Sequence, residues 1–255
     1  MATYKKRGYK PKNKAEEKQA EEMQSTTAEV FNTLDETASK SEQWIEKNSK
    51  PLFYGLIAVA GLILAFWAYN QYVVEPTEVE ASNELSYPRT NYDLSTTAKS
   101  TEVDSLLNLG LQGADGKYGF LDIASTYSGT KAGNLANYYA GLSYLRMKKY
   151  KEAIEYLSKF NADDKSVTPI ALGAIGDAFS DLEQYNDAVD YYEKAAKTDN
   201  SYTSPLFLFK AGQIALSQKE YSKAEGFFTT IKNKYPKSDQ AKDVEKFIYA
   251  AKYAQ

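Results

Sequence analysis

The chain has 255 residues, a formal net charge of −3, no histidine and no cysteine. Without these two residue types, the sequence excludes a Ser-His-Asp or Cys-His catalytic set and an ordinary zinc site. It also contains no G-x-x-x-x-G-K-[ST] or G-x-G-x-x-G phosphate-binding motif. We therefore expect no enzymatic activity, cofactor, metal or small-molecule substrate, and no nucleic-acid partner for the large domain.

Residues 1–50 form a polar arm that we predict to be cytoplasmic. Residues 1–14 are basic and nearly free of apolar groups, which favours disorder. They could bind anionic lipid headgroups or RNA, although a topology signal is the simpler interpretation. Residues 15–48 can be helical, either as a docking helix or as a solvated helix leading to the next segment. A weak apolar face on that helix carries Phe31, Leu34, Ala38 and Ile45.

The next segment, Leu52 to Val74, carries no charged residue and predicts a transmembrane helix over 51–74. At about 1.5 Å per residue it would reach roughly 34 Å, enough to cross a bilayer core of about 30 Å. Pro51 favours a helix start, and Trp44 and Trp67 lie near the two membrane interfaces. A buried helix of a soluble domain is the alternative, but such helices are rarely this long and uncharged. A polar arm precedes the stretch and no small-x-small site follows it, which favours an uncleaved signal anchor.

Basic residues predict the orientation of this helix. Lys40, Lys47 and Lys50 lie in the flank before the stretch, and Arg89 is the basic residue in the equivalent flank after it. This bias favours a cytoplasmic N-terminus and a C-terminal domain outside the cytoplasm. The absence of cysteine suits an oxidising periplasm. We therefore expect a single-pass protein of a bacterial inner membrane with its large domain in the periplasm.

Two less regular segments follow the predicted membrane helix. We expect residues 75–100 to form a juxtamembrane connector, helical at first, broken at Pro88 and then rich in serine and threonine. Residues 101–131 predict a degenerate helical hairpin that caps the domain beyond it. Its helices are expected at Val103 to Leu111 and Tyr118 to Tyr127, with a turn at Asp115-Gly116.

A repeat of 35 or 36 residues then covers 132–238. Each unit has a glycine, a tyrosine nine residues later, and an alanine three residues after that. Such spacing predicts two antiparallel helices: the glycine permits close approach, the tyrosine packs at the turn, and the alanine makes room for a neighbouring helix. A closing proline ends the last unit. The residues are Gly141, Gly176, Gly212, Tyr150, Tyr185, Tyr221, Ala153, Ala188, Ala224 and Pro236.

This pattern resembles the tetratricopeptide repeat (TPR), with a departure at the tryptophan of the family's first helix. The resemblance implies an all-α fold, in which one transmembrane helix precedes a TPR-type α-solenoid. The expected units are about 132–166, 167–203 and 204–238, and a C-terminal capping helix at 239–255 would follow them. One side of that helix carries Val244, Phe247, Ile248 and Ala251. The tryptophan position holds Asn137, Leu172 and Leu208.

In TPR arrays the first helices line a concave groove that binds protein partners. The basic-and-asparagine set that grips a C-terminal carboxylate in some TPR domains is missing here. The remaining mixture of aromatic, apolar and acidic groups suits extended or helical segments with some basic character. Several of these side chains could instead be core or solvated. The implied groove residues are Leu135, Tyr138, Leu142, Arg146, Ile170, Gly173, Asp177, Asp181, Leu206, Phe209, Gln213 and Ser217.

The order of parts is similar to the YfgM-type ancillary subunit of the bacterial Sec translocon. In this chain EQWIEKNSK leads into LFYGLIAVAGLILAFWAYNQYVV, and the repeats follow. The stretch YGFLDIASTYSGTKAGNLANYYAGLSYL resembles the form of these proteins in Bacteroidota. The resemblance implies a non-enzymatic partner of SecYEG whose periplasmic domain meets exported chains or chaperones. The alternative is a structural TPR component of another envelope complex, for outer-membrane assembly, secretion or division.

Overall fold

The computed structural model describes residues 14–162, 164 and 166–254, and side chains at residues 30, 34 and from 44 onward. It divides into two compact units, Met1–Tyr69 and Asn70–Gln255. The predicted disordered segment 1–14 lies outside the described residues, apart from Lys14.

The described part of the first unit is a single helix, α1 (Lys14–Tyr69). The prediction that a helix starts at Pro51 is wrong, because α1 contains Pro51 in its interior. Proline inside a helix removes one backbone hydrogen bond, but α1 continues through Pro51. On the predicted amphipathic face, Leu34 and Ile45 are exposed, whereas the side chains of Phe31 and Ala38 lie outside those described.

One helical stretch among the described residues, within Trp44–Thr97, is long and apolar enough to cross a membrane. This follows from its length and composition alone, and no part of its most apolar window is buried. Leu62 and Phe66, for example, are 71% and 70% exposed. A surface of this kind is unfavourable in water. The described residues therefore contain one candidate membrane anchor, in the N-terminal third of the sequence.

The second unit begins with a π-helical turn, η1 (Asn70–Val74), and three helices: α2 (Glu75–Glu84), α3 (Ser86–Thr97) and α4 (Ser100–Gln112). The connector was expected to break at Pro88, but the helical run is interrupted at Leu85. Pro88 lies in the first turn of α3, where a backbone N–H has no helical partner to lose. Helix therefore continues past Pro88, through the part of the segment that was expected to be a Ser/Thr-rich connection.

A short hairpin and a short helix lead to the repeats. Strands β1 (Gly113–Ala114) and β2 (Lys117–Tyr118) pair antiparallel around Asp115 and Gly116. Both turn residues have positive φ, 52° and 75°, as a type I′ turn requires. Helix α5 (Phe120–Thr126) follows. These two short strands are a small addition to an otherwise helical unit.

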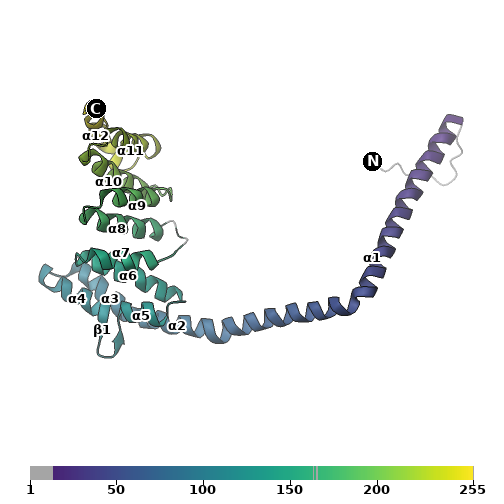
Figure 1. Ribbon diagram of the computed structural model, residues 1–255, viewed down its shortest axis with the longest axis horizontal. Helices are drawn as coiled ribbons and strands as arrows, with labels where there is room; N and C mark the ends of the chain where they lie inside the picture. The colour runs from purple at the N-terminus through teal and green to yellow at the C-terminus, as the bar shows by residue number, and fades with distance from the viewer. Residues whose placement is uncertain (1–13, 163, 165, 255) are drawn as a thin grey trace. The chain divides into compact units, whose positions relative to one another are not determined.

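Three helical pairs form the rest of the unit and stack in chain order (Figure 1). They are α6 (Lys131–Arg146) with α7 (Tyr150–Lys159), α8 (Val167–Asp181) with α9 (Tyr185–Ala196), and α10 (Thr203–Ser217) with α11 (Tyr221–Lys234). A short 3-10 turn, η2 (Gln240–Lys242), and α12 (Val244–Tyr253) then cover α11. The predicted all-α fold of packed helical pairs is confirmed.

The turn inside each pair repeats the period of the sequence. Lys148, Glu183 and Lys219 have positive φ of 59°, 60° and 63°. In each turn the following N–H donates to the carbonyl five residues before it, as in Lys149 N to Tyr144 O at 2.9 Å. This is the helix-ending Schellman arrangement, which usually contains glycine at the left-handed position.

Helix α2 is fixed to the start of α6. The Glu78 carboxylate accepts hydrogen bonds from the backbone N–H groups of Lys131 and Ala132, at 2.8 and 3.1 Å. The Tyr127 hydroxyl donates to Glu80 at 3.1 Å. A carboxylate at a helix N-terminus satisfies free N–H groups and complements the helix dipole. Helix α2 is therefore part of the folded second unit.

Candidate functional site

The first helices of the three pairs form the inner layer of the stack. Helix α6 contacts α8, and α8 contacts α10, more extensively than α7 contacts α9 or α9 contacts α11. In a solenoid of helical pairs, closer spacing in one layer curves the stack toward that layer. We use the term groove for the sequence-predicted residues on these first helices, from Leu135 to Ser217.

Glycines determine how closely the two helices of a pair approach. A Cβ atom on Gly141 would lie 2.5 Å from Leu157 Cγ, and one on Gly176 would lie 2.6 Å from Tyr192 Cε1. On Gly212 it would lie 2.7 Å from Phe228 Cε1. These distances are too short for any larger residue unless the opposing side chain, or the helix that carries it, moves. The alanines of the second helices, Ala153, Ala188 and Ala224, are fully buried.

The remaining repeat residues mark the ends of the second helices. Tyr150, Tyr185 and Tyr221 are the first residues of α7, α9 and α11, and each is half-buried. Helix α11 ends at Lys234, and Tyr235, the residue before Pro236, follows it. A residue that precedes proline disfavours helical geometry, which accounts for this end.

The groove residues of α6 are largely packed into the protein. The Tyr138 ring lies 5.4 Å from Tyr139 and 5.1 Å from Phe160, measured between ring centroids. Burial, together with the neighbouring tyrosines, raises the pKa of Tyr138 to about 12. Leu135 and Leu142 pack partly against the core. This helix therefore offers little free apolar surface to a partner.

Arg146, at the end of α6, is paired within the chain. Its Nη2 donates to the Ser95 carbonyl at 2.9 Å and its Nη1 donates to the Ser95 hydroxyl. The guanidinium also lies over the Tyr92 ring, 5.7 Å from its centroid. These contacts join α6 to α3, a helix that the sequence analysis left out of the site.

Asp177 on α8 is also paired within the chain. Its carboxylate accepts a hydrogen bond from the Tyr192 hydroxyl at 2.6 Å. It also forms an ion pair with Lys210, whose Nζ lies 2.6 Å away. Burial, and then the bond and charge of Asp177, raise the pKa of Tyr192 well above its usual value. The Asp177 charge is thus largely neutralised by Lys210. The groove is less acidic than the sequence predicts.

Asp181, one turn further along α8, is exposed and lines a hollow of about 330 Å³. Arg146, Tyr150, Asp177 and Tyr192 line the same hollow. Burial, and then the charge and hydrogen bond of Asp181, raise the pKa of the Tyr150 hydroxyl. The structure therefore brings together three predicted groove residues and a predicted turn tyrosine at the junction of α6, α7 and α8.

The third helix of the layer is partly occupied by aromatic packing. Phe209 lies edge-on to Phe228 and Phe247, with centroids 5.7 and 5.0 Å away. It therefore packs among α10, α11 and α12 rather than standing open in a groove. Leu206 is half-buried in the same core, whereas Gln213 and Ser217 are exposed.

Gly173 and Ile170 on α8 differ in exposure. Gly173 is buried beneath Phe207, whose ring would lie 1.9 Å from an added Cβ atom. The interpretation of Gly173 as a lining residue is wrong, because the Phe207 ring fills that position. Ile170 is 41% exposed. Four groove residues are exposed without being closely packed: Ile170, Asp181, Gln213 and Ser217.

Sequence reasoning missed Lys210, Phe207 and the α3 contacts. A lysine in the interior of a mostly apolar helix, LFLFKAGQ, is a signal that it has an acidic partner. A second glycine inside the helix, at Gly173, is a signal of close approach by another element. The contribution of Ser95 carried no such signal.

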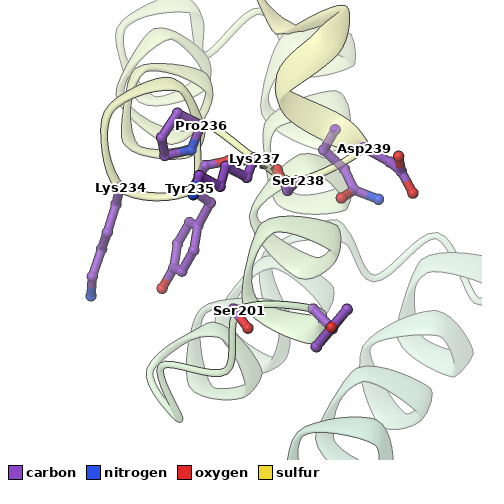
Figure 2. A pocket seen from close by; sticks show the side chains of 9 residues that line it. Ser201, Lys234, Tyr235, Pro236, Lys237, Ser238 and Asp239 are labelled. Atoms are coloured by element: carbon purple, nitrogen blue, oxygen red, sulfur yellow. Dashed lines mark hydrogen bonds between the residues drawn. The ribbon is translucent and has the colours of Figure 1, made fainter.

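A second hollow, of about 490 Å³, lies between the α9–α10 turn and the segment after α11 (Figure 2). Lys234 and Tyr235 line it, and both side chains reach Asp199, at 2.9 and 2.8 Å. These contacts hold the end of one pair to the start of the next. The hollow is bordered by the exposed Tyr202 and by Pro236, which the sequence had assigned a purely structural role.

Comparison with known proteins agrees with this geometry. Two family models, both described as tetratricopeptide repeat, match residues 135–164 and 174–239. No curated protein matches the chain. The matched repeats are of a typically non-catalytic kind, and their packed pairs are those described above. The chain therefore carries tetratricopeptide repeats within residues 135–239 and a long apolar helix toward its N-terminus.

Proposed function

We propose that this protein is a non-enzymatic, membrane-tethered scaffold that serves as an accessory subunit of the SecYEG translocon. The apolar helix would anchor it in a bacterial inner membrane, with its N-terminus in the cytoplasm. The tetratricopeptide repeats would then lie in the periplasm and meet exported chains or periplasmic chaperones. TPR domains suggest protein–protein interaction, and the chain order resembles that of the YfgM-type subunit.

One observation carries the scaffold part of this proposal. A single chain holds an unburied apolar helix and a folded array whose inner layer keeps an open hollow beside Asp181. The hollow contains charged and tyrosine groups but no described cluster of three metal-ligating side chains. Such a surface suits recognition of another protein through polar and aromatic contacts.

The charge pairing within the groove narrows the type of partner. Lys210 neutralises Asp177, and Arg146 is held by Ser95, so Asp181 is the predicted groove acid with the most exposed carboxylate. A basic side chain on the partner would pair with Asp181 at the rim of the hollow. A rim charge of this kind mainly sets association rate and salt dependence.

The first experiment is purification of the full-length protein in a mild detergent. SecY and SecE are expected as its main partners. Recovery of a different envelope complex in their place would favour the structural-component alternative. Recovery of neither would contradict the proposed role at the translocon.

A second experiment asks which surface is used. A photo-crosslinking residue at Gln213 or Asp181 should capture a Sec component, a chaperone or an exported chain. Both positions are exposed, whereas Tyr138 and Phe209 are half-buried in aromatic clusters and would perturb the fold. Lys151, exposed on α7, is the matched control. Equal capture at Lys151 would show that the groove is not the interaction surface.

A further inference from the structure

The hollow beside Asp181 contains two side chains of opposite charge that do not pair with each other. Arg146 comes from the end of α6 in the first helical pair, and Asp181 comes from the end of α8 in the second. Both residues are exposed. Within the part of the chain that the structure describes, neither of them has an ion pair. The fold therefore leaves a positive and a negative group open in one hollow.

The guanidinium of Arg146 is fixed in position, but its charge is not neutralised. Its Nη1 and Nη2 donate to the hydroxyl and the carbonyl of Ser95, which are uncharged acceptors. The Tyr92 ring beside it, 5.7 Å from centroid to guanidinium, carries an uncharged phenol. A guanidinium has five N–H donors, so two bonds leave further donors for a ligand. Arginine held in this way is prepared to bind a carboxylate.

The carboxylate of Asp181 is also held by a neutral group, since its described contact is a hydrogen bond with the Tyr150 hydroxyl. Asp177 differs, because Lys210 lies 2.6 Å from it and neutralises its charge. Lys148, in the turn after α6, lines the same hollow and is exposed. The first helical pair therefore supplies positive charge to the hollow, and the second supplies the negative charge of Asp181.

We propose that this hollow recognises a partner segment that carries an acidic and a basic side chain one helical turn apart. This inference rests on the proposed function and specifies the chemistry of the partner. The partner's side-chain carboxylate bonds Arg146, and its cation pairs with Asp181. Side chains at positions i and i+4 of a helix lie about 5–6 Å apart, so both can enter one hollow. A segment with a single charge, or with two like charges, leaves one of the two groups without a partner, which gives the hollow its selectivity.

Synthetic peptides test this assignment on the full-length protein in mild detergent. Four alanine-rich helical peptides, blocked at both ends, carry glutamate and lysine four residues apart, or glutamine in place of the first, the second or both. Each peptide also carries a benzoylphenylalanine photo-crosslinker, and mass spectrometry measures the yield of adducts on α6 and α8. The glutamate–lysine peptide should give at least about threefold more adduct than the others, since an exposed charge pair contributes a factor of this order. Equal yields from the four peptides, or no adduct on either helix, would overturn the proposal.

Variants of the protein then show which group reads which charge. Each peptide is compared with itself, so differences in helix content between the peptides cancel. In Arg146→Gln, replacing the peptide's glutamate should no longer change the yield, whereas replacing its lysine still should. In Asp181→Asn the two effects should be exchanged. Such a cycle isolates the interaction of the two groups that are changed. Equal losses for both peptide changes in both variants would contradict the assignment.

Two further variants control for effects on the fold and on overall charge. Arg146→Lys keeps the positive charge but loses the two-donor geometry, so it should retain part of the preference for glutamate. Lys151→Gln removes an exposed lysine outside the hollow and should leave the four yields unchanged. No Sec component or chaperone is present in these assays. Failure of the peptides therefore counts against the charge pair alone, whereas failure of the co-purification counts against the proposed function.

Discussion

At the scale of single residues, the inner helices depend on positions where no side chain fits. The glycines that the repeat predicts face the second helix of their own pair, but Gly173 faces the next pair. The Phe207 ring of α10 lies over its Cα. The contact between the second and third pairs therefore rests on a glycine outside the repeat pattern.

This arrangement predicts opposite effects for two substitutions of glycine by alanine. Gly173→Ala would force the Phe207 ring out of its buried place, and overpacking of this kind costs about 1–3 kcal/mol. Gly226→Ala, at a glycine of α11 with no atom within 4 Å of its added Cβ, should stabilise the fold by about 0.5–1 kcal/mol. Thermal unfolding of the full-length protein in detergent, followed by circular dichroism, measures both. Equal melting temperatures would contradict the packing described here.

Tyr138 leads to a prediction about alkaline pH. Its pKa is raised to about 12 from the ordinary 10.0, so the folded state holds the neutral hydroxyl more firmly than the unfolded chain. The stabilisation is complete below pH 10 and is lost as the pH rises through 12. As the pH rises from 10 to 12, the free energy of unfolding should therefore fall less in Tyr138→Phe than in the parent protein. Urea titrations at several pH values measure this fall. Tyr253→Phe controls for the removal of one phenol, and identical slopes in Tyr138→Phe and the parent would count against the prediction.

The residue types near the site were predictable only in part. The repeat pattern singled out Gly141, Gly176 and Gly212 because it recurs, and recurrence is visible in the sequence. Contacts between residues of different units do not recur with the period. The repeat pattern therefore does not predict the pairing of Lys210 with Asp177 or of Arg146 with Ser95. The sequence predicts Arg146, Asp177 and Asp181 as groove charges, but it does not indicate their partners within the chain.

At the scale of elements, the turns inside the pairs carry conformational strain. Lys148, Glu183 and Lys219 occupy the left-handed region, which is unfavourable for residues that carry a Cβ atom. The Schellman hydrogen bonds and the packing of the pairs on either side hold the backbone there. Because the strain recurs at the same point of each unit, a substitution that relieves it at one of these turns should stabilise the fold.

Lys219→Gly should raise the free energy of unfolding by about 0.5–1 kcal/mol, because glycine adopts this φ without strain. The same substitution at Lys151, inside α7, should lower it by about 1 kcal/mol, since glycine is unfavourable within a helix. Comparing the two substitutions separates the effect of backbone geometry from the effect of losing a lysine charge. A destabilised Lys219→Gly variant would show that the side chain at this turn matters more than its φ.

The connector shows why some elements escape sequence analysis. Residues 75–100 lack a strong apolar face, so the sequence predicts helix only up to a break at Pro88, followed by a connection rich in serine and threonine. Their packing instead depends on two polar contacts with α6. Glu78 accepts a hydrogen bond from the backbone N–H of Lys131 at the start of α6, and the Ser95 carbonyl accepts one from Arg146 at its end. These are polar contacts over more than fifty residues of sequence, and local patterns carry no trace of them.

At the scale of the whole molecule, the chain combines an apolar helix suited to a membrane with a helical array suited to protein partners. Each part was predictable because it rests on a long-range regularity, an uncharged stretch in one case and a period of 35 or 36 residues in the other. The partner is a different matter. The proposed recognition depends on groups that stay exposed in the folded array, such as Asp181, and their exposure becomes visible only in three dimensions.

The orientation of the apolar helix decides which compartment holds those groups. Basic residues are retained on the cytoplasmic side of a membrane helix, and Lys40, Lys47 and Lys50 precede this one. Alkaline phosphatase, which folds only in an oxidising compartment, should be active when fused after Gln255 and inactive when fused before Met1. Replacing the three lysines with glutamine should reduce the first activity if these charges set the orientation, whereas the same change at Lys148, Lys149 and Lys151 should not. Activity only in the fusion before Met1 would place the array in the cytoplasm, where neither an exported chain nor a periplasmic chaperone could reach Asp181.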